Sequence, residues 1–281
     1  MRVAVASGKG GTGKTILATS LALSWEGSAF ADCDVEAPNA HLLLRPDITS
    51  RRRVTVPVPR VREEDCLHCG ECADFCRYNA LAVLPEQWMV FDELCHSCGG
   101  CSIVCPTRAI DEVPRQVGTI LEGRAGDIPF LQGVLDEGEA QAVPVIQDVL
   151  KALPRDVDVI LDSPPGASCP MLAVAEAADV VLLVTEPTPF GLHDLEAAIR
   201  AVRQLDRPMA VLINRSDWGD GSVERICREH AIPILLEIPH SLHVARGYAR
   251  GRPLVETIPS FRPSLEAIRT SLRRLAREAA A

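Results

Sequence analysis

The sequence predicts an α/β fold built on a mostly parallel sheet, with a small cysteine-rich α+β domain inserted into it. Short apolar runs rich in Val, Ile and Leu alternate along the chain with longer stretches of helical periodicity. This is the pattern of strands that are buried on both faces of a parallel sheet. A glycine-rich loop follows the first run, and eight of the eleven cysteines fall between residues 66 and 105. The cysteine-rich stretch therefore interrupts the alternation.

The composition is that of a globular protein. Of the 281 residues, 47% are hydrophobic and 24% are charged, which is close to the average. The net charge of −9 argues against a general nucleic-acid binder, because phosphate neutralisation needs a basic face. No apolar run of 18 residues occurs, and the first strand leads directly into the glycine-rich loop. We therefore expect a cytoplasmic protein without a transmembrane helix or a signal peptide, and we expect no nucleic-acid partner.

The first part of the chain reads as strand, loop, helix and strand, at residues 3–6, 7–15, 16–25 and 28–31. Between Arg51 and Arg62 the sequence becomes rich in Arg and Pro, which is typical of a linker. We place a domain boundary there. The predicted inserted domain is 61–112, and the larger domain is discontinuous, comprising 1–60 and 113–281.

The alternation of strands and helices resumes after the cysteines. Strands are expected at 157–161, 180–184, 210–213 and 233–236, and helices at 145–153, 191–205 and 222–230. The chain ends in an amphipathic helix, 264–281. We expect this helix to close the domain, with contact to a membrane surface as the weaker alternative. Its apolar face carries Leu265, Ile268, Leu272 and Leu275.

The glycine-rich loop fits G-x-x-x-x-G-K-[ST] in the required context, after an apolar strand and before a helix. Its glycines let successive backbone N–H groups converge on phosphate oxygens at a helix N-terminus. Lys14 is expected to contact the β- and γ-phosphates, and the Thr15 hydroxyl to coordinate Mg²⁺. The sequence therefore predicts a nucleotide site whose loop residues are Gly8, Lys9, Gly10, Gly11, Thr12, Gly13, Lys14 and Thr15.

Aspartates follow two of the predicted strands. Asp32 and Asp34 come after the second strand, and Asp162 ends a later one. Each alone is compatible with an ordinary strand end or helix cap. Together they lie at the carboxyl edge of the sheet, where open α/β sheets bind ligands. We therefore assign them to the nucleotide site.

Two matching cysteine runs have the C-x₂-C-x₂-C-x₃-C spacing of two-cluster ferredoxins, in which the fourth thiolate is exchanged between the runs. A single zinc ion is a poorer fit, because each run supplies three close ligands and one distant ligand. Arg77 stands where a proline usually follows the fourth cysteine of the first run. The spacing predicts two [4Fe–4S] clusters, one on Cys66, Cys69, Cys72 and Cys105 and the other on Cys76, Cys95, Cys98 and Cys101.

A second lysine in the phosphate loop, Lys9, makes the sequence resemble the deviant phosphate-loop ATPases that include MinD, ParA and the nitrogenase iron protein. The resemblance implies an ATP-dependent homodimer in which Lys9 reaches the partner's phosphates, as an arginine finger does. It also implies that Asp34 acts in hydrolysis, and that Asp162 holds Mg²⁺ with Thr15 and Asp32. Its expected nucleotide contacts outside the loop are Gly166, Asn214, Arg215 and Pro239.

With the cysteine runs included, the whole chain resembles MinD-superfamily ATPases that contain an inserted ferredoxin domain. The resemblance implies an ATPase, with or without stimulation by a partner, in which nucleotide state gates electron transfer from the clusters to an unidentified redox or metal-cofactor protein. Two alternatives stay open. One is a carrier for iron–sulfur or metal-cofactor assembly. The other is a MinD/ParA-like positioning ATPase with a redox-sensing or structural iron–sulfur module.

Three cysteines lie outside the two runs. Cys33 and Cys227 are expected to pack as small hydrophobic residues. Cys169 stands seven residues after Asp162, a spacing similar to that of a cluster-bridging cysteine in the nitrogenase iron protein. No second cysteine for such a bridge occurs between residues 113 and 150. A bridging cluster is therefore the weaker hypothesis.

Overall fold

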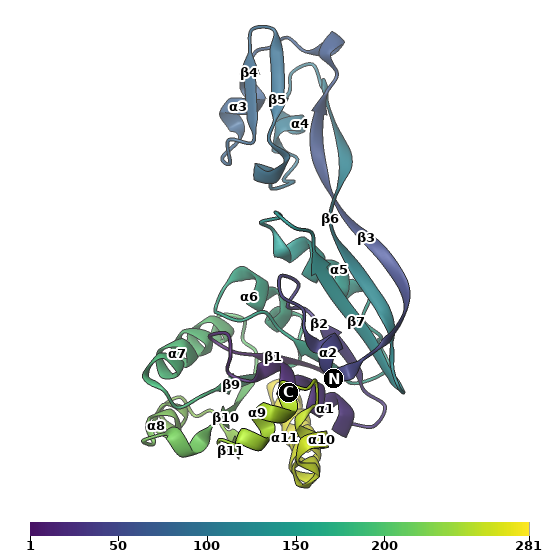
Figure 1. The fold of residues 1–281 in the computed structure, drawn as a ribbon. Coiled ribbons are helices and arrows are strands. Elements are labelled where there is room, and N and C mark those ends of the chain that lie inside the picture. The colour runs from purple at the N-terminus through teal and green to yellow at the C-terminus, as the bar shows by residue number, and fades with distance from the viewer. Residues whose placement is uncertain (281) are drawn as a thin grey trace.

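The computed structural model describes residues 1–280, and its centre is a twisted sheet (Figure 1). Within these residues the sheet has nine strands in the order β11-β10-β9-β1-β8-β2-β7-β6-β3. All neighbours from β11 to β7 pair in parallel. The parallel strands are mainly apolar, as expected of strands that are covered on both faces. They are β1 (Arg2–Ala6), β2 (Ala29–Asp32), β7 (Ile128–Leu135), β8 (Val159–Asp162), β9 (Val180–Thr185), β10 (Met209–Asn214) and β11 (Ile234–Ile238).

Helices cover both faces of this sheet. One face packs against α5 (Ala142–Lys151), α6 (Cys169–Glu176), α7 (Pro189–Arg203) and α8 (Ser222–Glu229). The other packs against α1 (Lys14–Ser24), α2 (Ala40–Leu44), α10 (Leu254–Thr257) and α11 (Arg262–Ala280), with α9 (Leu242–Tyr248) packed on α10. The doubly wound architecture predicted from the sequence is confirmed. Single 3₁₀ turns occur at Glu63–Asp65, Asp92–Leu94, Ser216–Trp218 and Pro259–Phe261.

The C-terminal helix α11 closes the larger body. Its residues Leu265 and Leu272 are completely buried in the second core, and the Trp25 indole N–H donates to the Leu265 carbonyl at 2.8 Å. The apolar face of α11 is therefore already occupied. Among residues 1–280, no helix is long and apolar enough to cross a membrane.

The prediction of a linker between Arg51 and Arg62 is wrong. These residues belong to β3 (Asp47–Val61), a 15-residue strand that pairs antiparallel with β6 (Ile110–Ala125), which in turn pairs with β7. Every second residue in the middle of β3 is a buried valine, at Val54, Val56 and Val58, and this alternation outweighs the Arg and Pro residues around them. Proline is tolerated because β3 is the edge strand and needs no partner on its outer side.

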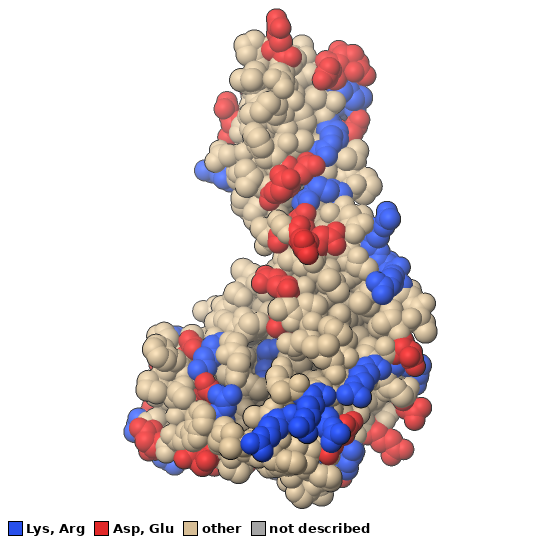
Figure 2. Space-filling view, viewed as in Figure 1, with Lys and Arg blue, Asp and Glu red and all other residues tan. Residues whose placement is uncertain are grey.

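The strands β3 and β6 form a ribbon that rises from the sheet and carries a small lobe at its tip (Figure 1). The lobe contains the antiparallel hairpin β4 (Leu81–Leu84) and β5 (Gln87–Val90), together with α3 (Glu71–Phe75) and α4 (Gly100–Val104). It has a small core of its own around Cys72, Leu81 and Ile110. Figure 2 shows a narrow waist between lobe and body, with acidic side chains gathered there on the visible face. The domain limits of 61 and 112 stay a prediction.

Candidate nucleotide-binding site

The glycine-rich loop joins β1 to α1 at the carboxyl edge of the parallel sheet. Gly11 and Gly13 have φ angles of +81° and +92°, a backbone conformation that side chains disfavour. A Cβ on Gly8 would lie 2.1 Å from the Asp194 carbonyl oxygen of α7. Glycine is thus required both to turn the loop and to seat it against a neighbouring helix.

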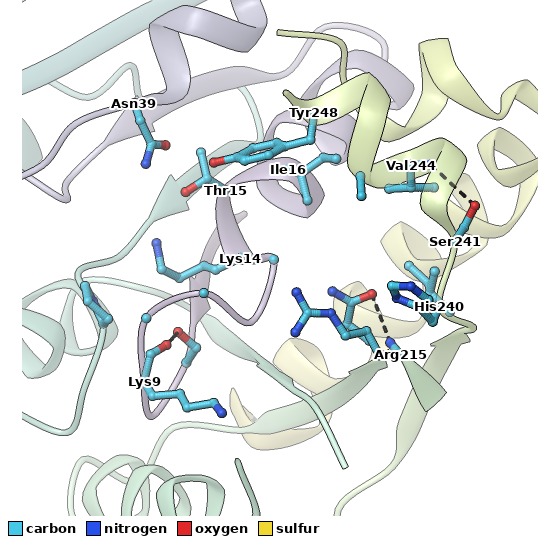
Figure 3. Close-up of a pocket in the computed structure, with 18 of the residues that line it drawn as sticks. Lys9, Lys14, Thr15, Ile16, Asn39, Arg215, His240, Ser241, Val244 and Tyr248 are labelled. Carbon is cyan, nitrogen blue, oxygen red and sulfur yellow. Dashed lines mark hydrogen bonds between the residues drawn. The ribbon is translucent and has the colours of Figure 1, made fainter. Parts of the chain in front are cut away.

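A cavity of about 450 Å³ opens beside this loop (Figure 3). Cavities of this size accommodate small-molecule ligands. Its walls combine the loop with residues from the ends of several other elements. Of the predicted site residues, it is lined by Lys9, Gly10, Gly11, Gly13, Lys14, Thr15, Asp34, Asn214, Arg215 and Pro239.

Lys14 lies in a buried acidic environment at the phosphate end of the cavity. Its Nζ is 2.7 Å from Asp162 Oδ1 and 3.9 Å from Asp34 Oδ2. Burial alone would lower the pKa of Lys14, but the neighbouring aspartates outweigh it and raise that pKa. The lysine is therefore charged and is held ready for anionic phosphates.

The carboxyl group of Asp34 is partly buried near the same lysine. Burial raises its pKa to about 6, against the attraction of Lys14 and with repulsion from Asp162. At neutral pH Asp34 is mostly ionised, yet it titrates close to that range. A carboxylate tuned in this way is suited to orient a water molecule and to accept its proton.

The neighbouring Asp32 is fully buried. Its Oδ1 accepts the N–H of Asp34 at 3.1 Å, and its Oδ2 accepts those of Asn39 and Ala40. Burial, with repulsion from Asp162, raises its pKa to about 8. In this structure Asp32 therefore shapes the turn after β2, and direct coordination of Mg²⁺ by Asp32 stays a prediction.

Asp162 has one oxygen engaged and one free. Its Oδ1 binds Lys14, whereas its Oδ2 is buried without a hydrogen-bond partner. A buried carboxylate oxygen of this kind is costly unless a cation or donor completes it. Together with the Thr15 hydroxyl oxygen in the cavity wall, it gives the hard oxygen donors that Mg²⁺ prefers. The residues therefore fit the predicted metal.

The N–H of Gly166, expected to meet the γ-phosphate, donates to the Ser7 carbonyl at 2.9 Å. Gly166 has a φ of +93°, so the turn after Asp162 depends on glycine. In this structure its N–H is therefore occupied within the chain. A contact with phosphate requires this hydrogen bond to break.

Asn214 fastens the far side of the cavity to the phosphate loop. Its side-chain amide donates to the Thr12 carbonyl at 2.8 Å, and its Oδ1 accepts the N–H of Arg215 at 3.0 Å. The remaining wall is largely apolar. It includes residues that the sequence patterns did not single out, namely Ile16, Ile238, Val244, Ala245 and Tyr248.

Lys9, the second lysine of the phosphate loop, forms an ion pair within its own chain. Its Nζ lies 2.5 Å from Glu186 Oε1, and the other carboxylate oxygen of Glu186 binds Arg215. Figure 3 shows the ammonium groups of Lys9 and Lys14 on opposite sides of the loop. Sequence reasoning did not assign a role to Glu186, which directly follows β9.

In the lobe, the two predicted cysteine sets line two separate cavities. Cys76, Cys95, Cys98 and Cys101 line one, and Cys66, Cys69, Cys72 and Cys105 line the other. The fourth cysteine of each run thus lies beside the first three of the other run. Backbone N–H groups donate to three of the sulfurs, from Ala80 to Cys76, from Ser97 to Cys95 and from Ala109 to Cys105.

Across residues 1–280, no three or more His, Cys, Asp or Glu side chains form a group that could hold a metal ion. A four-iron cubane holds its thiolates farther apart than one tetrahedral ion does. Two pockets of four cysteines with N–H donors to sulfur fit the donor set of cubane clusters.

The remaining cysteines are separate from these pockets. Cys33 and Cys227 are buried, and burial raises the pKa of Cys227 to about 11. Both are packed in the main core, as expected. Cys169 is exposed at the start of α6.

A doubly wound parallel sheet, a phosphate loop at its carboxyl edge and an aspartate at the end of a neighbouring strand define a P-loop nucleotide-binding protein. The chain matches the CobQ/CobB/MinD/ParA nucleotide binding domain over residues 3–254. It belongs to this family.

Two relatives are uncharacterized proteins of Methanocaldococcus jannaschii. MJ0578 is 31% identical over 248 residues, which cover 85% of this chain and 86% of the relative. MJ0579 is 28% identical over 262 residues, which cover 91% and 92%. The similarity therefore extends across most of each protein.

Solved structures share the fold. The septum site-determining protein MinD of Pyrococcus horikoshii, complexed with Mg-ADP, has a TM-score of 0.55 and 17% identity, covering 99% of this chain and 94% of that one. A single-residue variant of McdA from Cyanothece, complexed with ATP, has a TM-score of 0.54 and 18% identity, covering 96% and 95%. These structures show the fold alone, and the comparisons contain no support for iron–sulfur clusters or electron transfer.

Proposed function

We propose that this protein binds and hydrolyses ATP with Mg²⁺ and dimerises in the ATP-bound state, as a nucleotide switch of the MinD/ParA kind. One observation carries the proposal. A charged Lys14 is buried between Asp34 and Asp162 at the end of a cavity large enough for a nucleotide. Among the hypotheses drawn from the sequence, the comparisons favour the MinD/ParA-like ATPase.

The residues of the cavity suggest how ATP is bound. The loop amides and Lys14 receive the phosphates, so that Lys14 exchanges Asp162 for phosphate oxygens. Thr15 and the free oxygen of Asp162 are the groups that would hold Mg²⁺, which neutralises charge on the β- and γ-phosphates when bound. The purine would lie between the apolar wall and Asn214, whose amide can both donate and accept.

Hydrolysis requires a water molecule in line with the γ-phosphate. Asp34 is placed to orient that water and to accept its proton, because its carboxylate lies near Lys14 and its pKa is raised to about 6. The Gly166 N–H would leave the Ser7 carbonyl and donate to the γ-phosphate. Loss of that phosphate would then return the N–H to Ser7, which gives the loop two states.

The test is to compare the wild type with Lys14→Gln for nucleotide affinity and ATP turnover. We expect the wild type to bind Mg-ATP and to release phosphate. In Lys14→Gln the turnover should fall by about a hundredfold or more, because the charge that faces the phosphates is gone. A wild type that binds no nucleotide at millimolar concentration would contradict the proposal.

As a second candidate function, we propose that the lobe holds two [4Fe–4S] clusters and that nucleotide state gates their electron transfer to a redox partner. The two four-cysteine pockets support it. When bound, such clusters accept and donate single electrons. The sheet also connects the two sites, because only β7 lies between β2, which ends at Asp32, and the ribbon of β6 and β3 that carries the lobe.

This candidate is tested by anaerobic reconstitution, iron and sulfide analysis, and voltammetry with ADP and with an ATP analogue. We expect about eight irons per chain and reduction potentials that differ between the two nucleotides. A full iron content with identical potentials would support a structural or sensing lobe in a positioning ATPase. Liposome co-sedimentation with and without ATP would then test positioning at a membrane.

A further inference from the structure

Glu186 is a buried carboxylate between two cations that come from different parts of the nucleotide site. Its side chain is 8% exposed, and it binds Lys9 from the phosphate loop and Arg215 from the loop after β10. Lys9 also approaches the Thr188 hydroxyl at 3.5 Å. The lysine that the family resemblance assigns to a partner's phosphates is therefore engaged in its own chain.

We propose that Glu186 holds Lys9 in an inactive position and releases it to the partner subunit when ATP is bound. Glu186 is then a positioning residue that sets the threshold for dimerisation. The inference rests on the proposed ATP-dependent dimer and deepens it. The observation behind it is the contact of 2.5 Å between the Glu186 carboxylate and the lysine that the resemblance assigns to the partner's phosphates.

The backbone around Glu186 is fixed, so any rearrangement falls on the side chains. Its carbonyl accepts the Thr188 N–H at 2.8 Å, and the Thr188 hydroxyl caps α7 by accepting the Gly191 N–H at 3.1 Å. A Cβ on Gly191 would come within 2.2 Å of the Glu186 carbonyl oxygen. The backbone of Glu186 therefore stays in place, and release of Lys9 requires only movement of side chains.

Arg215 makes the release of Lys9 possible without leaving a buried charge unpaired. A lone buried carboxylate is strongly unfavourable. With two cations around Glu186, departure of Lys9 leaves the pair of Glu186 and Arg215 intact. The three groups together carry one net positive charge. After Lys9 leaves, the remaining pair of Glu186 and Arg215 is neutral.

The same arginine links Glu186 to the nucleotide. Arg215 lines the cavity, its guanidinium lies 5.3 Å from the centre of the Trp218 ring, and its backbone N–H donates to Asn214. When a bound nucleotide strengthens the ion pair between Arg215 and Glu186, Arg215 competes with Lys9 for the carboxylate. Occupancy of the cavity is thereby communicated to the lysine that completes the partner's site.

The experiment measures dimerisation of the full chain by sedimentation velocity at saturating ATP analogue, with nucleotide affinity determined separately. Glu186→Gln keeps the size of the side chain and removes its charge. We expect this variant to dimerise at a protein concentration about tenfold lower than the wild type requires, since loss of a charge pair changes binding by about this factor. Arg215→Gln leaves Lys9 as the only cation on Glu186, and we expect it to dimerise at a severalfold higher concentration.

The two opposite shifts separate this inference from a structural role, because a variant that merely disturbs the fold weakens dimerisation in both cases. Lys9→Gln, alone and combined with Glu186→Gln, is the control and should remain monomeric. If the wild type fails to dimerise with the ATP analogue, the proposed function fails. If the wild type dimerises, Lys9→Gln does not, and both Glu186→Gln and Arg215→Gln match the wild type, the inference alone is overturned. Should Glu186→Gln not fold, Glu186→Ala, which also removes the charge, takes its place, and dimerisation of this variant at a concentration no lower than the wild type requires would overturn the inference.

Discussion

Replacing Asp34 by asparagine should stabilise the nucleotide-free protein while it impairs hydrolysis. The pKa of Asp34 is raised from 3.8 to about 6 by burial, so the folded protein binds a proton more tightly than the unfolded chain does. The stability contributed by the neutral form is therefore present below about pH 4 and is lost as the pH rises to about 6. Above that range the ionised carboxylate destabilises the fold by a constant amount.

The two pKa values set the size of the effect. At about pH 7.5 the ionised group costs about 3 kcal/mol, and at about pH 5 it costs about half as much. Asparagine removes this cost at every pH. For a domain of this size each kcal/mol raises Tm by about 2–4 °C. Asp34→Asn should therefore melt about 6–12 °C above the wild type at the higher pH and about half as far above it at the lower one.

The assay is thermal unfolding without nucleotide or Mg²⁺, followed by circular dichroism at both pH values. Glu26→Gln is a matched control, because Glu26 is exposed at the end of α1. Its Tm should follow that of the wild type. Phosphate release by Asp34→Asn should fall by about tenfold or more, because the group that orients water is lost. An Asp34→Asn protein that melts below the wild type at the higher pH would refute the burial argument.

Two further predictions concern the loop and the lobe. Gly13→Ala should weaken ATP binding in a fluorescent-nucleotide titration and lower the Tm, because its Cβ would lie 2.5 Å from Asn214 Nδ2 at a φ of +92°. Gly10→Ala, whose Cβ meets nothing within 4 Å, should retain the wild-type Tm; equal losses of Tm in both variants would count against the steric reason. Cys76→Ser should retain about half of the reconstituted iron, because one pocket loses a ligand. Cys169→Ser should retain all of it, and a loss of iron there would revive a bridging cluster.

The parts of the fold that follow local patterns could be predicted from the sequence. The buried parallel strands are continuous apolar runs, and the phosphate loop is defined by glycines, a lysine and a threonine in fixed order. The ribbon was missed because its strands mix valines with Arg and Pro, and that composition resembles a linker. The strand becomes evident only from the pairing of β3 with β6, which follows it in the chain after the whole lobe.

The site residues that belong to a sequence motif could be predicted. Those whose role depends on contact with residues distant in the sequence were missed. Lys14, Thr15 and Asp162 belong to motifs, and the structure brings them to one edge of the sheet. Glu186 was given no role, because its importance comes from contact with Lys9 and Arg215, which are far away in sequence. Asp32 was expected at the metal, whereas its oxygens accept three backbone N–H groups.

The dependence of ATPase rate on protein concentration tests the central claim most directly. If Lys9 completes the site of a partner subunit, the rate per chain must rise with protein concentration and level off once the dimer is saturated. Lys9→Gln should give a low rate that is independent of concentration. A constant rate per chain in the wild type, matched by Lys9→Gln, would contradict the proposed ATP-dependent dimer.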